Sequence, residues 1–254
     1  MASNGKVLRT IVVGFAAVVV CALGARSAQQ AGGEKMFEED VIKSEAGDLK
    51  ITFLGHASLM FGYQGKTIYV DPVGNPSGTP VDYSKLPKAD IILVTHEHFD
   101  HLDPKAISTL RKEQTKIILT KACAEKVSGG TVMKNGDTLT VQGIKIEAVP
   151  AYNIVQKFHP KGVGNGYILN FDKTRVYVAG DTENTPEMKQ LKNMDVAFLP
   201  MNLPYTMTPE MVADAAKAFQ PKILYPYHYG QTDPNKLIDL LKDSKTQVRV
   251  RKMK

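Results

Sequence analysis

The densest group of chemistry-bearing residues is the segment Thr95–His101, which reads THEHFDH. It holds three histidines and one aspartate within six positions, directly after a short apolar run. Imidazole nitrogens and carboxylate oxygens are the ligands that zinc and similar divalent ions prefer, and burying them without a partner is costly. We expect His96 and His98 to turn one way and Asp100 and His101 another, so that one loop begins two metal sites.

Two further candidates follow apolar runs later in the chain. Asp181 comes after Gly180, at the end of the expected strand Arg175–Ala179, and His228 follows the expected strand Ile223–Tyr225. A carboxylate has two oxygens and can therefore span two ions, whereas an imidazole adds a ligand to one. Turn chemistry is the alternative for the aspartate, and a hydrogen-bonded core histidine is the alternative for the histidine.

The elements that must position these residues follow from the hydrophobic pattern. In each half of the chain, strands joined by turns come first, and strands alternating with helices come next. This layout predicts an α/β fold in which two mixed β-sheets pack together with helices outside, a four-layer αββα sandwich. The expected strands are Leu49–Phe53, Ser58–Tyr63, Thr67–Val70, Ile91–Val94, Lys116–Leu119, Thr138–Val141, Ile144–Val149, Gly166–Phe171, Arg175–Ala179, Val196–Leu199, Ile223–Tyr225 and Val248–Val250. The expected helices are Pro104–Arg111, Lys121–Val127, Glu187–Leu191, Pro209–Phe219 and Asn235–Leu241.

The motifs, in their order along the chain, resemble those of the metallo-β-lactamase fold superfamily. The H-x-H-x-D-H segment is accompanied by Leu54–Ser58 (LGHAS), Asp71-Pro72, Gly180–Thr182 (GDT) and Pro226–Gly230 (PYHYG). These companions look like the branch that contains L-ascorbate-6-phosphate lactonase and N-acyl-phosphatidylethanolamine-hydrolysing phospholipase D. The resemblance covers nearly all of residues 48–254. It implies a metal-dependent hydrolase of an ester, a lactone or a phosphodiester, rather than a true β-lactamase.

The resemblance also implies a role for each motif residue. The first ion would be bound by His96 and His98, the second by Asp100, His101 and His228, and both by Asp181. Zinc is the expected ion, with manganese or iron as alternatives. Two divalent ions roughly 3.5–4 Å apart can lower the pKa of a bridging water. Asp100 would then take up the proton of this water while remaining a ligand.

The first metal site departs from the family pattern. A third histidine usually follows the strand that corresponds to Ile144–Val149, but here Asn153 stands in that position. An amide oxygen is a poor ligand for zinc and a fair one for harder ions. His159 lies six residues further along and can reach back to complete the site. The alternative is that His159 only lines the cleft, which would leave the first site weak.

Two more residues are candidates for supporting roles. Asp71 ends a strand and can accept the outer N–H of a ligand histidine. His56 can line the cleft or bind substrate. Turn chemistry is the alternative interpretation of both residues.

We expect the loop near His159 and the loop before the helix at Pro209 to carry side chains that line the cleft. Phe158, Tyr205 and Met207 can form an apolar wall, although the stretch around Tyr205 can instead serve only to cap the helix. Basic side chains are scarce near the motif loops, so phosphate recognition has little support. The nearby basic pair is Lys157 and Lys161.

The amino terminus is typical of a targeting segment. Lys6 and Arg9 precede an apolar run of fifteen residues that ends at Ala25. A spanning helix needs roughly 20 such residues, so a secretory signal peptide is favoured over an uncleaved anchor. We therefore assign residues 1–28 to a signal peptide, 29–47 to a loose polar leader and 48–254 to the hydrolase domain. The domain would be exported, either periplasmic or secreted, and only an uncleaved N-terminal segment would contact a membrane.

The composition limits the partners. The chain has 254 residues, of which 43% are apolar and 23% charged, as in ordinary soluble globular proteins. Loss of Lys6, Arg9 and Arg26 with the signal peptide lowers the net charge from +6 to +3, which does not call for nucleic acid. Two cysteines, one of them in the signal peptide, cannot build a disulfide scaffold. A small-molecule substrate is the expected partner, and no feature favours a particular oligomeric state.

Two other function classes are compatible with the same motifs. The first is a di-iron oxidoreductase of the same fold, with a flavin partner or glutathione-linked sulfur chemistry. The second is a non-catalytic or degenerate protein that binds a metal or ligand, which the departure at Asn153 motivates. Metal analysis and turnover assays distinguish these classes from a hydrolase.

Overall fold

The computed structural model describes residues 1–5, 36–75, 78 and 80–253. The chain divides into two units, Met1–Lys35 and Met36–Lys254. Nearly all of the assigned signal peptide, and the first part of the assigned leader, lie outside the described residues. Within the described part of the chain, no helix is long and apolar enough to cross a membrane.

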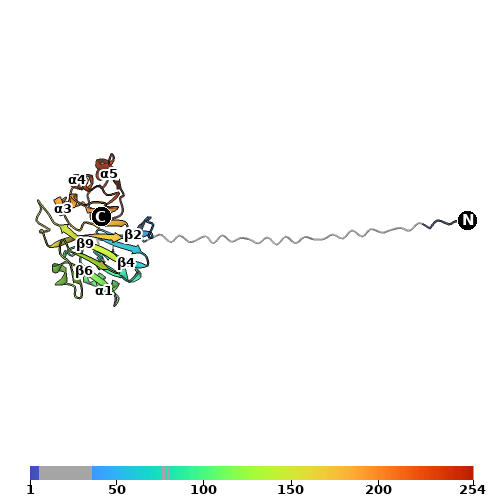
Figure 1. The fold of residues 1–254 in the computed structure, drawn as a ribbon, viewed down its shortest axis with the longest axis horizontal. Helices are drawn as coiled ribbons and strands as arrows, with labels where there is room; N and C mark the ends of the chain where they lie inside the picture. The colour runs from blue at the N-terminus through green and yellow to red at the C-terminus, as the bar shows by residue number, and fades with distance from the viewer. Residues whose placement is uncertain (6–35, 76–77, 79, 254) are drawn as a thin grey trace. The chain divides into compact units, whose positions relative to one another are not determined.

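Two mixed β-sheets of seven strands each form the second unit (Figure 1). The first sheet contains, in spatial order, β1 (Glu38–Ile42), β2 (Leu49–Gly55), β3 (Ser58–Tyr63), β4 (Lys66–Val70), β5 (Ile91–Leu93), β6 (Lys116–Leu119) and β7 (Thr131–Val132). The second contains β14 (Gln247–Val248), β13 (Ile223–Tyr227), β12 (Val196–Pro200), β11 (Thr174–Val178), β10 (Gly164–Phe171), β9 (Ile144–Ala151) and β8 (Thr138–Val141).

Each sheet repeats one plan. Strands β1 to β4 are antiparallel neighbours and β4 to β7 are parallel neighbours. Likewise, β8 to β11 are antiparallel and β11 to β14 are parallel. Parallel strands place their carboxyl ends at the same edge of a sheet, which is where ligands of open α/β sheets bind.

Helices cover the outer faces of the two sheets. Helices α1 (Pro104–Leu110) and α2 (Lys121–Ala124) and the 3-10 turn η2 (Tyr83–Lys85) pack on the first sheet through a shared apolar cluster. Helices α3 (Pro186–Lys189), α4 (Pro209–Phe219) and α5 (Asn235–Leu241) belong to the second sheet. Figure 1 shows α3, α4 and α5 on one side of the sheets and α1 on the other. The predicted αββα sandwich is confirmed.

Strand β5 shows how the sequence dictates this layering. Successive side chains of a strand point to opposite faces. Ile91 and Leu93 join the core between the sheets, whereas Ile92 joins the cluster beneath α1. A strand that is covered on both faces has no position for a polar side chain, which explains the uninterrupted apolar run before the histidine segment.

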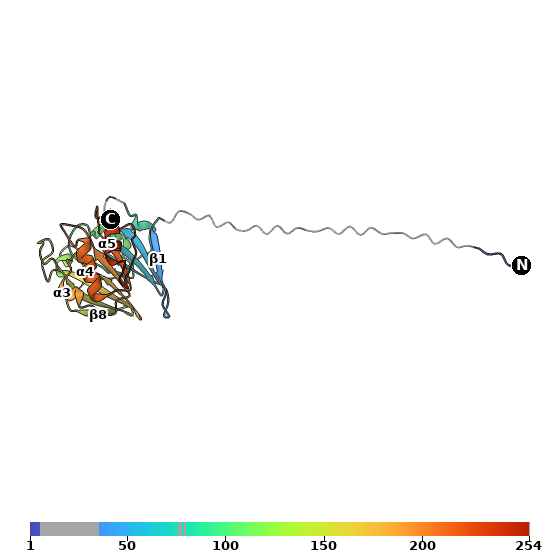
Figure 2. The same ribbon diagram turned by 90° about the horizontal axis from the view of Figure 1, so that it is seen from above.

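Strand β1 differs from the sequence-based expectation. Residues 29–47 were expected to form a loose leader, but Glu38–Ile42 pair in antiparallel register with β2. Figure 2 shows β1 at the edge of the sheet, where charged side chains are common because they prevent pairing with other chains. The carboxylate of Asp40 anchors the strand, accepting hydrogen bonds at 2.7 and 2.8 Å from Arg251. The expectation of a loose leader is therefore wrong for this segment.

Other boundaries shift by a few residues. Strand β10 begins at Gly164, before the expected Gly166, and β14 ends before Val250. Helix α2 ends at Ala124, although the pattern predicted helix to Val127. The short strand β7 and the turn η2 were not expected, because two or three residues give no readable period.

Candidate metal centre

The candidate residues all follow the ends of strands. Because the register is parallel from β4 to β5 and from β11 to β13, these ends meet at one edge of the two sheets. The residues and their strands are His56 after β2, Asp71 after β4, His96 to His101 after β5, Asn153 and His159 after β9, Asp181 after β11 and His228 after β13. Residues that lie up to 172 positions apart, from His56 to His228, are therefore brought to one place.

The first ligand group consists of His96, His98 and His159, whose ring nitrogens lie within 4.8 Å of one another. The Nδ1 atom of His159 is 2.8 Å from the side-chain oxygen of Asn153, which also accepts the backbone N–H of His159 at 2.9 Å. Asn153 therefore turns its oxygen toward the outer nitrogen of His159. Of the two residues considered for the third ligand, His159 is the one that the structure brings into the group.

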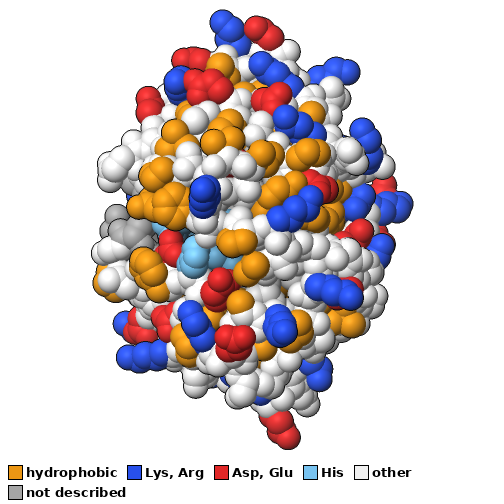
Figure 3. Space-filling model, turned by 90° about the vertical axis from the view of Figure 1, so that its left-hand side faces the viewer, with side chains coloured by type: hydrophobic (Ala, Val, Ile, Leu, Met, Phe, Trp, Pro, Cys, Tyr) orange, Lys and Arg blue, Asp and Glu red, His pale blue; other side chains and the backbone are white. Residues whose placement is uncertain are grey.

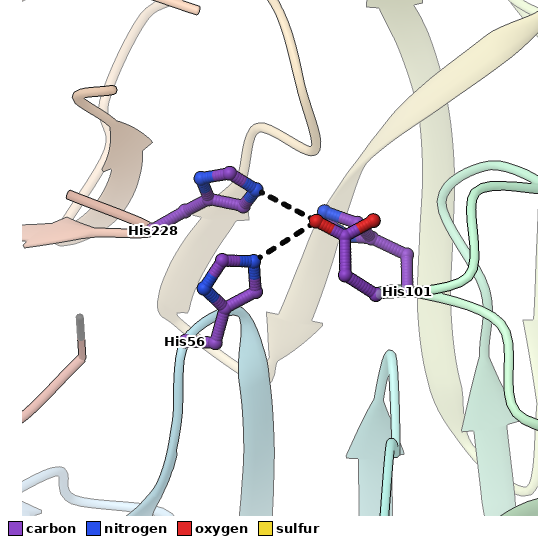
Figure 4. A group of neighbouring side chains, drawn as sticks. His56, His101 and His228 are labelled. Atoms are coloured by element: carbon purple, nitrogen blue, oxygen red, sulfur yellow. Dashed lines mark hydrogen bonds and ion pairs between the residues drawn. The ribbon is translucent and has the colours of Figure 1, made fainter. Parts of the chain in front are cut away.

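The second ligand group consists of His56, Asp100, His101 and His228, again with ligand atoms within 4.8 Å. Figure 4 shows the rings of His56 and His228 directed at one carboxylate oxygen. This oxygen is Oδ2 of Asp100, which lies 3.1 Å from His56 Nε2 and 3.4 Å from His228 Nε2. His56 thus lies among the ligand atoms, whereas the sequence suggested only a place in the cleft or a contact with substrate.

Asp181 lies between the two groups. Its Oδ1 atom is 3.3 Å from His101 Nε2, and its Oδ2 atom is 3.3 Å from His159 Nε2 and 3.4 Å from His228 Nε2. The preceding Gly180 has a φ of +66°, and an added Cβ would lie 3.1 Å from the Cβ of Thr95. Only glycine fits both this conformation and this space, and the turn that it forms places the carboxylate of Asp181 between the two groups.

Hydrogen bonds fix the outer nitrogens of His96 and His101, whereas Nδ1 of His228 has no hydrogen-bond partner among the described residues. His101 Nδ1 is 2.7 Å from Asp71 Oδ2, and His96 Nδ1 is 3.0 Å from the hydroxyl of Thr95. Thr95 in turn donates its backbone N–H to Asp71 at 2.8 Å and its hydroxyl at 2.6 Å. These contacts leave each Nε2 atom facing the centre, which is the arrangement that metal-binding histidines require. Asp71 therefore stands where the sequence suggested an acceptor.

Three of these residues have a left-handed backbone. The φ angles are 53° at His56, 45° at Asp71 and 49° at His228. Residues other than glycine rarely adopt this region. Such conformations cost roughly 1–3 kcal/mol each and concentrate at functional sites. They reverse the chain directly after a strand. A backbone hydrogen bond of 3.0 Å from His228 N to His56 O then joins the two sheets at the centre.

The buried groups of the site differ in how their surroundings shift their pKa values. Burial and the neighbouring His101 hold the pKa of His96 well below its ordinary value. Burial alone would lower the pKa of His101, but the carboxylates of Asp181 and Asp71 raise it well above that value. Burial raises the pKa of Asp181 and Asp100, yet contacts with histidines outweigh this and lower both. The carboxylates are therefore ionised, as metal ligands must be.

The fit to a metal can be tested on the buried polar atoms. Buried polar atoms nearly always have hydrogen-bond partners. Within the described residues, eleven buried side-chain atoms have none, and five of these face the candidate centre: Nε2 of His96, His101, His159 and His228 and Oδ1 of Asp181. The others include Nδ1 of His228, Oε2 of Glu97 and the hydroxyls of Tyr177 and Tyr227. Imidazole nitrogens and a carboxylate oxygen that converge in this way fit a divalent cation.

A cleft of about 560 Å³ opens onto the centre. Phe158 and Tyr205 form one wall, with ring centroids 5.0 Å apart in an edge-on arrangement. The expectation that Met207 joins this wall is wrong, because its side chain is fully buried in the core. Thr208 caps α4, accepting the N–H of Met211, so Tyr205 is free to line the cleft.

The basic side chain at the cleft differs from the pair that the sequence suggested. Lys161 is engaged with Glu187 at 2.7 Å, and neither it nor Lys157 is among the cleft-lining residues. Lys126, just after α2, lines the cleft instead, with its Nζ donating to the backbone oxygen of Glu97 at 2.9 Å. No local motif marks Lys126, since only the fold brings α2 beside the histidine segment.

Known proteins share both the sequence and the fold of this chain. The model of the beta-lactamase superfamily domain matches residues 50–228. A UPF0173 metal-dependent hydrolase of Methanopyrus kandleri is 32% identical over 200 residues, which cover 73% of this chain and 86% of that protein. A solved structure from Parabacteroides distasonis, described as a metal-dependent hydrolase, shares 53% identity with a TM-score of 0.83, and the match covers 86% of this chain and 100% of that one.

A second solved structure is similar at a greater distance. The metallo hydrolase Igni18 of Ignicoccus hospitalis is 28% identical, with a TM-score of 0.69 and coverage of 81% of this chain and 95% of that one. The relatives are matched over most of their length, and the residues that the family model matches, 50–228, include the histidine segment, Asp181 and His228. The chain therefore belongs to the metallo-beta-lactamase superfamily, and within it to the metal-dependent hydrolases.

Proposed function

We propose that the two ligand groups hold two divalent ions and that the protein hydrolyses an ester, a lactone or a phosphodiester. The observation that supports this most directly is Asp181, whose carboxylate lies 3.3–3.4 Å from unpaired histidine nitrogens of both groups. His96, His98 and His159 would hold one ion, and Asp100, His101 and His228 the other. His56 would orient Asp100 through the contact at 3.1 Å.

The side chains at the cleft fit hydrolysis without a covalent intermediate. Bound divalent ions supply Lewis acidity and lower the pKa of a coordinated water. Asp100 lines the cleft, and its side chain is 27% exposed, whereas Asp181 is 4% exposed. Asp100 is thus the carboxylate placed to accept a proton from the cleft. The described residues that line the cleft include no serine, threonine or cysteine, so none of these can serve there as a nucleophile.

The proposal is tested by metal content and turnover in wild-type protein and an Asp181→Ala variant. We expect two ions per wild-type chain, and loss of at least one ion together with more than ~100-fold loss of activity in the variant, since a ligand to both ions is removed. Bis(p-nitrophenyl) phosphate, p-nitrophenyl acetate and a simple lactone are suitable substrates. A Glu45→Gln variant, changed at an exposed residue, is the control and should keep the metal content and the activity of the wild type.

Other outcomes would support the competing classes. One ion or none, with no turnover after addition of zinc, manganese or iron, would indicate a degenerate binding protein. Two irons with no hydrolysis of any substrate would indicate an oxidoreductase.

We further propose zinc as the resident metal. The first group consists of three imidazoles, and nitrogen donors of this kind favour zinc over harder ions such as magnesium. Competition among zinc, manganese and iron for the apoprotein, read by elemental analysis, tests the preference. Retention of manganese against equimolar zinc would contradict it.

We also propose that the protein is exported. The support is the sequence of residues 1–28, in which basic residues precede a short apolar run, the pattern of a signal peptide. Cell fractionation followed by intact mass of the recovered protein is the test. A periplasmic or secreted chain that begins between Ala25 and Ala31 is expected. A full-length chain in the membrane fraction would indicate an uncleaved anchor, and one in the cytosol would refute export.

A further inference from the structure

Exposed apolar side chains border the cleft above the metal centre. Phe99, Phe158 and Tyr205 line the cleft and are 86%, 44% and 45% exposed. Figure 3 shows a histidine at the surface with hydrophobic side chains on several sides of it. Monomeric proteins rarely gather large apolar side chains on the surface unless the patch binds something.

The same loops expose further apolar residues. Ile154 and Val155, which precede Phe158, are 54% and 75% exposed, and Leu203, which precedes Tyr205, is 49% exposed. We call the three residues that line the cleft the apolar rim: Phe99, Phe158 and Tyr205. Together with their chain neighbours Ile154, Val155 and Leu203, they account for half of the twelve large apolar side chains that are exposed among the described residues.

The loop that carries part of the apolar rim is firmly held. The buried carboxylate of Glu183 accepts the backbone N–H groups of Ile154, Val155 and Gln156 at 2.7, 2.8 and 3.0 Å. Three charge-assisted hydrogen bonds to one buried acid fix this backbone strongly. The apolar side chains are therefore presented to solvent by an ordered backbone.

The cleft has few side chains that could bind an anionic group of a substrate. Of the described residues that line it, Lys126 is the one cation, and its Nζ already donates to the oxygen of Glu97. Glu97, Asp100 and Asp181 contribute carboxylates, and Asn202 is the one neutral amide. Among the described residues, no arginine lines the cleft, and arginine is the side chain that binds a phosphate through two parallel hydrogen bonds.

We propose that the substrate presents an uncharged ester or lactone carbonyl to the metal centre and lays an apolar chain across the apolar rim. This inference rests on the proposed hydrolase function and narrows its substrate class. In the reaction, water adds to the acyl carbon and the bond from that carbon to the alcohol oxygen breaks. The products are a carboxylic acid and an alcohol, which takes one proton of the water.

The test compares p-nitrophenyl acetate with p-nitrophenyl octanoate on the metal-loaded protein. Each methylene group that is fully buried contributes about 0.8 kcal/mol, so two contribute roughly a tenfold preference. We expect kcat/KM to be at least about tenfold higher for the octanoate than for the acetate. Equal values would overturn the proposal.

Variants locate the origin of the preference. Phe99→Ser and Tyr205→Ser should lower the octanoate-to-acetate ratio at least about threefold each, as apolar contact is lost. Tyr205→Phe keeps the ring and should keep the ratio. Ile238→Ser, at a 40% exposed residue of α5 outside the cleft, should leave it unchanged. Metal content is measured for every variant, and an unaltered ratio in both serine variants at full metal content would overturn the proposal.

A binding measurement separates this inference from the proposed function. Isothermal titration calorimetry compares octanoate with acetate, two carboxylates that differ only in chain length. We expect at least about tenfold tighter binding of octanoate with a negative heat-capacity change. If chain length matters here but no ester or phosphodiester is turned over, the hydrolase function fails and the apolar site stands. If phosphodiester is hydrolysed and chain length has no effect in either assay, the apolar substrate fails and the hydrolase stands.

Self-association is the remaining explanation of the apolar rim, and sedimentation of the same variants addresses it. A dimer that dissociates in Phe99→Ser or Tyr205→Ser, without any change in chain-length preference, would overturn the proposal.

Discussion

The metal centre depends on which nitrogen each imidazole turns inward. Asp71, Thr95 and Asn153 each occupy an Nδ1 atom and thereby leave Nε2 toward the centre. None of the three needs to touch a metal for this purpose. Substitution of such residues typically weakens metal binding by about 10–100-fold, so the effect of a side chain on the centre can be large without any contact to an ion.

Asp71→Asn tests this role. Asparagine tolerates the left-handed backbone at this position, but it offers one acceptor oxygen in place of two and therefore loses a contact with Thr95 or His101. We expect metal affinity to fall about 10–100-fold, measured by competition with a chromogenic chelator. Asp82→Asn, at an exposed aspartate of the loop before η2, is the matched control. Unchanged affinity in Asp71→Asn would show that Asp71 does not orient His101.

Glu183→Gln tests the anchoring of the loop that carries His159. Two of the three N–H groups bind one carboxylate oxygen and the third binds the other. A glutamine must turn its NH₂ group toward at least one donor, so a bond is lost and the free energy of unfolding should fall by about 1–3 kcal/mol. Amide hydrogen exchange at residues 154–156 should accelerate. Glu187→Gln is the control, and equal protection in both proteins would refute the anchor.

Single residues also show which parts of the site could be predicted from the sequence and which could not. The histidine segment could be recognised because its members are neighbours in the chain. The choice between Asn153 and His159 depends on a hydrogen bond across a loop, and the place of Lys126 depends on the packing of α2. Neither the hydrogen bond nor the packing produces a periodic pattern in the sequence. Likewise, the distance between His56 and Asp100 follows only from the meeting of separate strands.

At the scale of elements, apolar strands were predicted well and polar or very short ones poorly. Strands β5 and β12 are covered on both faces and therefore have readable apolar runs. Strand β1 reads EEDVI, and its partner for Asp40 is Arg251, at the opposite end of the chain. A strand that is stabilised by such distant contacts cannot be recognised from its own residues.

Asp40→Asn tests how much this pairing stabilises β1. Burial raises the pKa of Asp40, but hydrogen bonds from Tyr225 and Arg251 outweigh it and hold the pKa below its ordinary value. A carboxyl with a lowered folded-state pKa stabilises the fold above its unfolded pKa of about 3.9, and this contribution is lost as the pH falls through the folded pKa. We therefore expect the variant to be less stable by about 1–3 kcal/mol at pH 7.

The difference between Asp40→Asn and wild type should begin to shrink below about pH 4, where the carboxyl of the unfolded chain takes up a proton, and should be lost as the pH falls through the lower folded-state pKa. Urea unfolding at pH 7 and pH 3 measures it. Glu45→Gln, which removes an exposed ion pair with Lys173, should change stability by less than about 0.5 kcal/mol at either pH. A constant difference for Asp40→Asn across this range would contradict the role of the charge.

At the scale of the whole molecule, the metal centre draws ligands from both sheets. The loop after β5 of the first sheet supplies His96, His98, Asp100 and His101, while the second sheet supplies His159, Asp181 and His228. The repeated strand plan, which the sequence did predict, is what places these loops opposite one another. The apolar rim was not predicted as a whole, because an isolated exposed aromatic residue looks the same in sequence as a buried one.

Thermal unfolding with and without metal tests this coupling. A ligand at 100 times its Kd stabilises the folded state by about 2.7 kcal/mol per site, which for a domain of this size raises Tm by roughly 5–10 °C. We expect EDTA to lower Tm by at least this amount and added zinc to restore it. The Tm of His228→Ala should change less on addition of EDTA or zinc, since one ligand of the proposed site has been removed. A Tm that is indifferent to EDTA in metal-loaded protein would show that the centre does not hold the sheets together.

The division of the ligands between the two sheets has a consequence for how the protein acquires its metal. A chain that is still being synthesised exposes the histidine segment before the later ligands, and it cannot form a complete centre until the stretch around His228 has folded. Affinities for divalent metals differ intrinsically, and the ion that is available often decides which one a site receives. If the proposed centre forms as the two sheets come together, the ions present in that cellular compartment would compete for it at that moment.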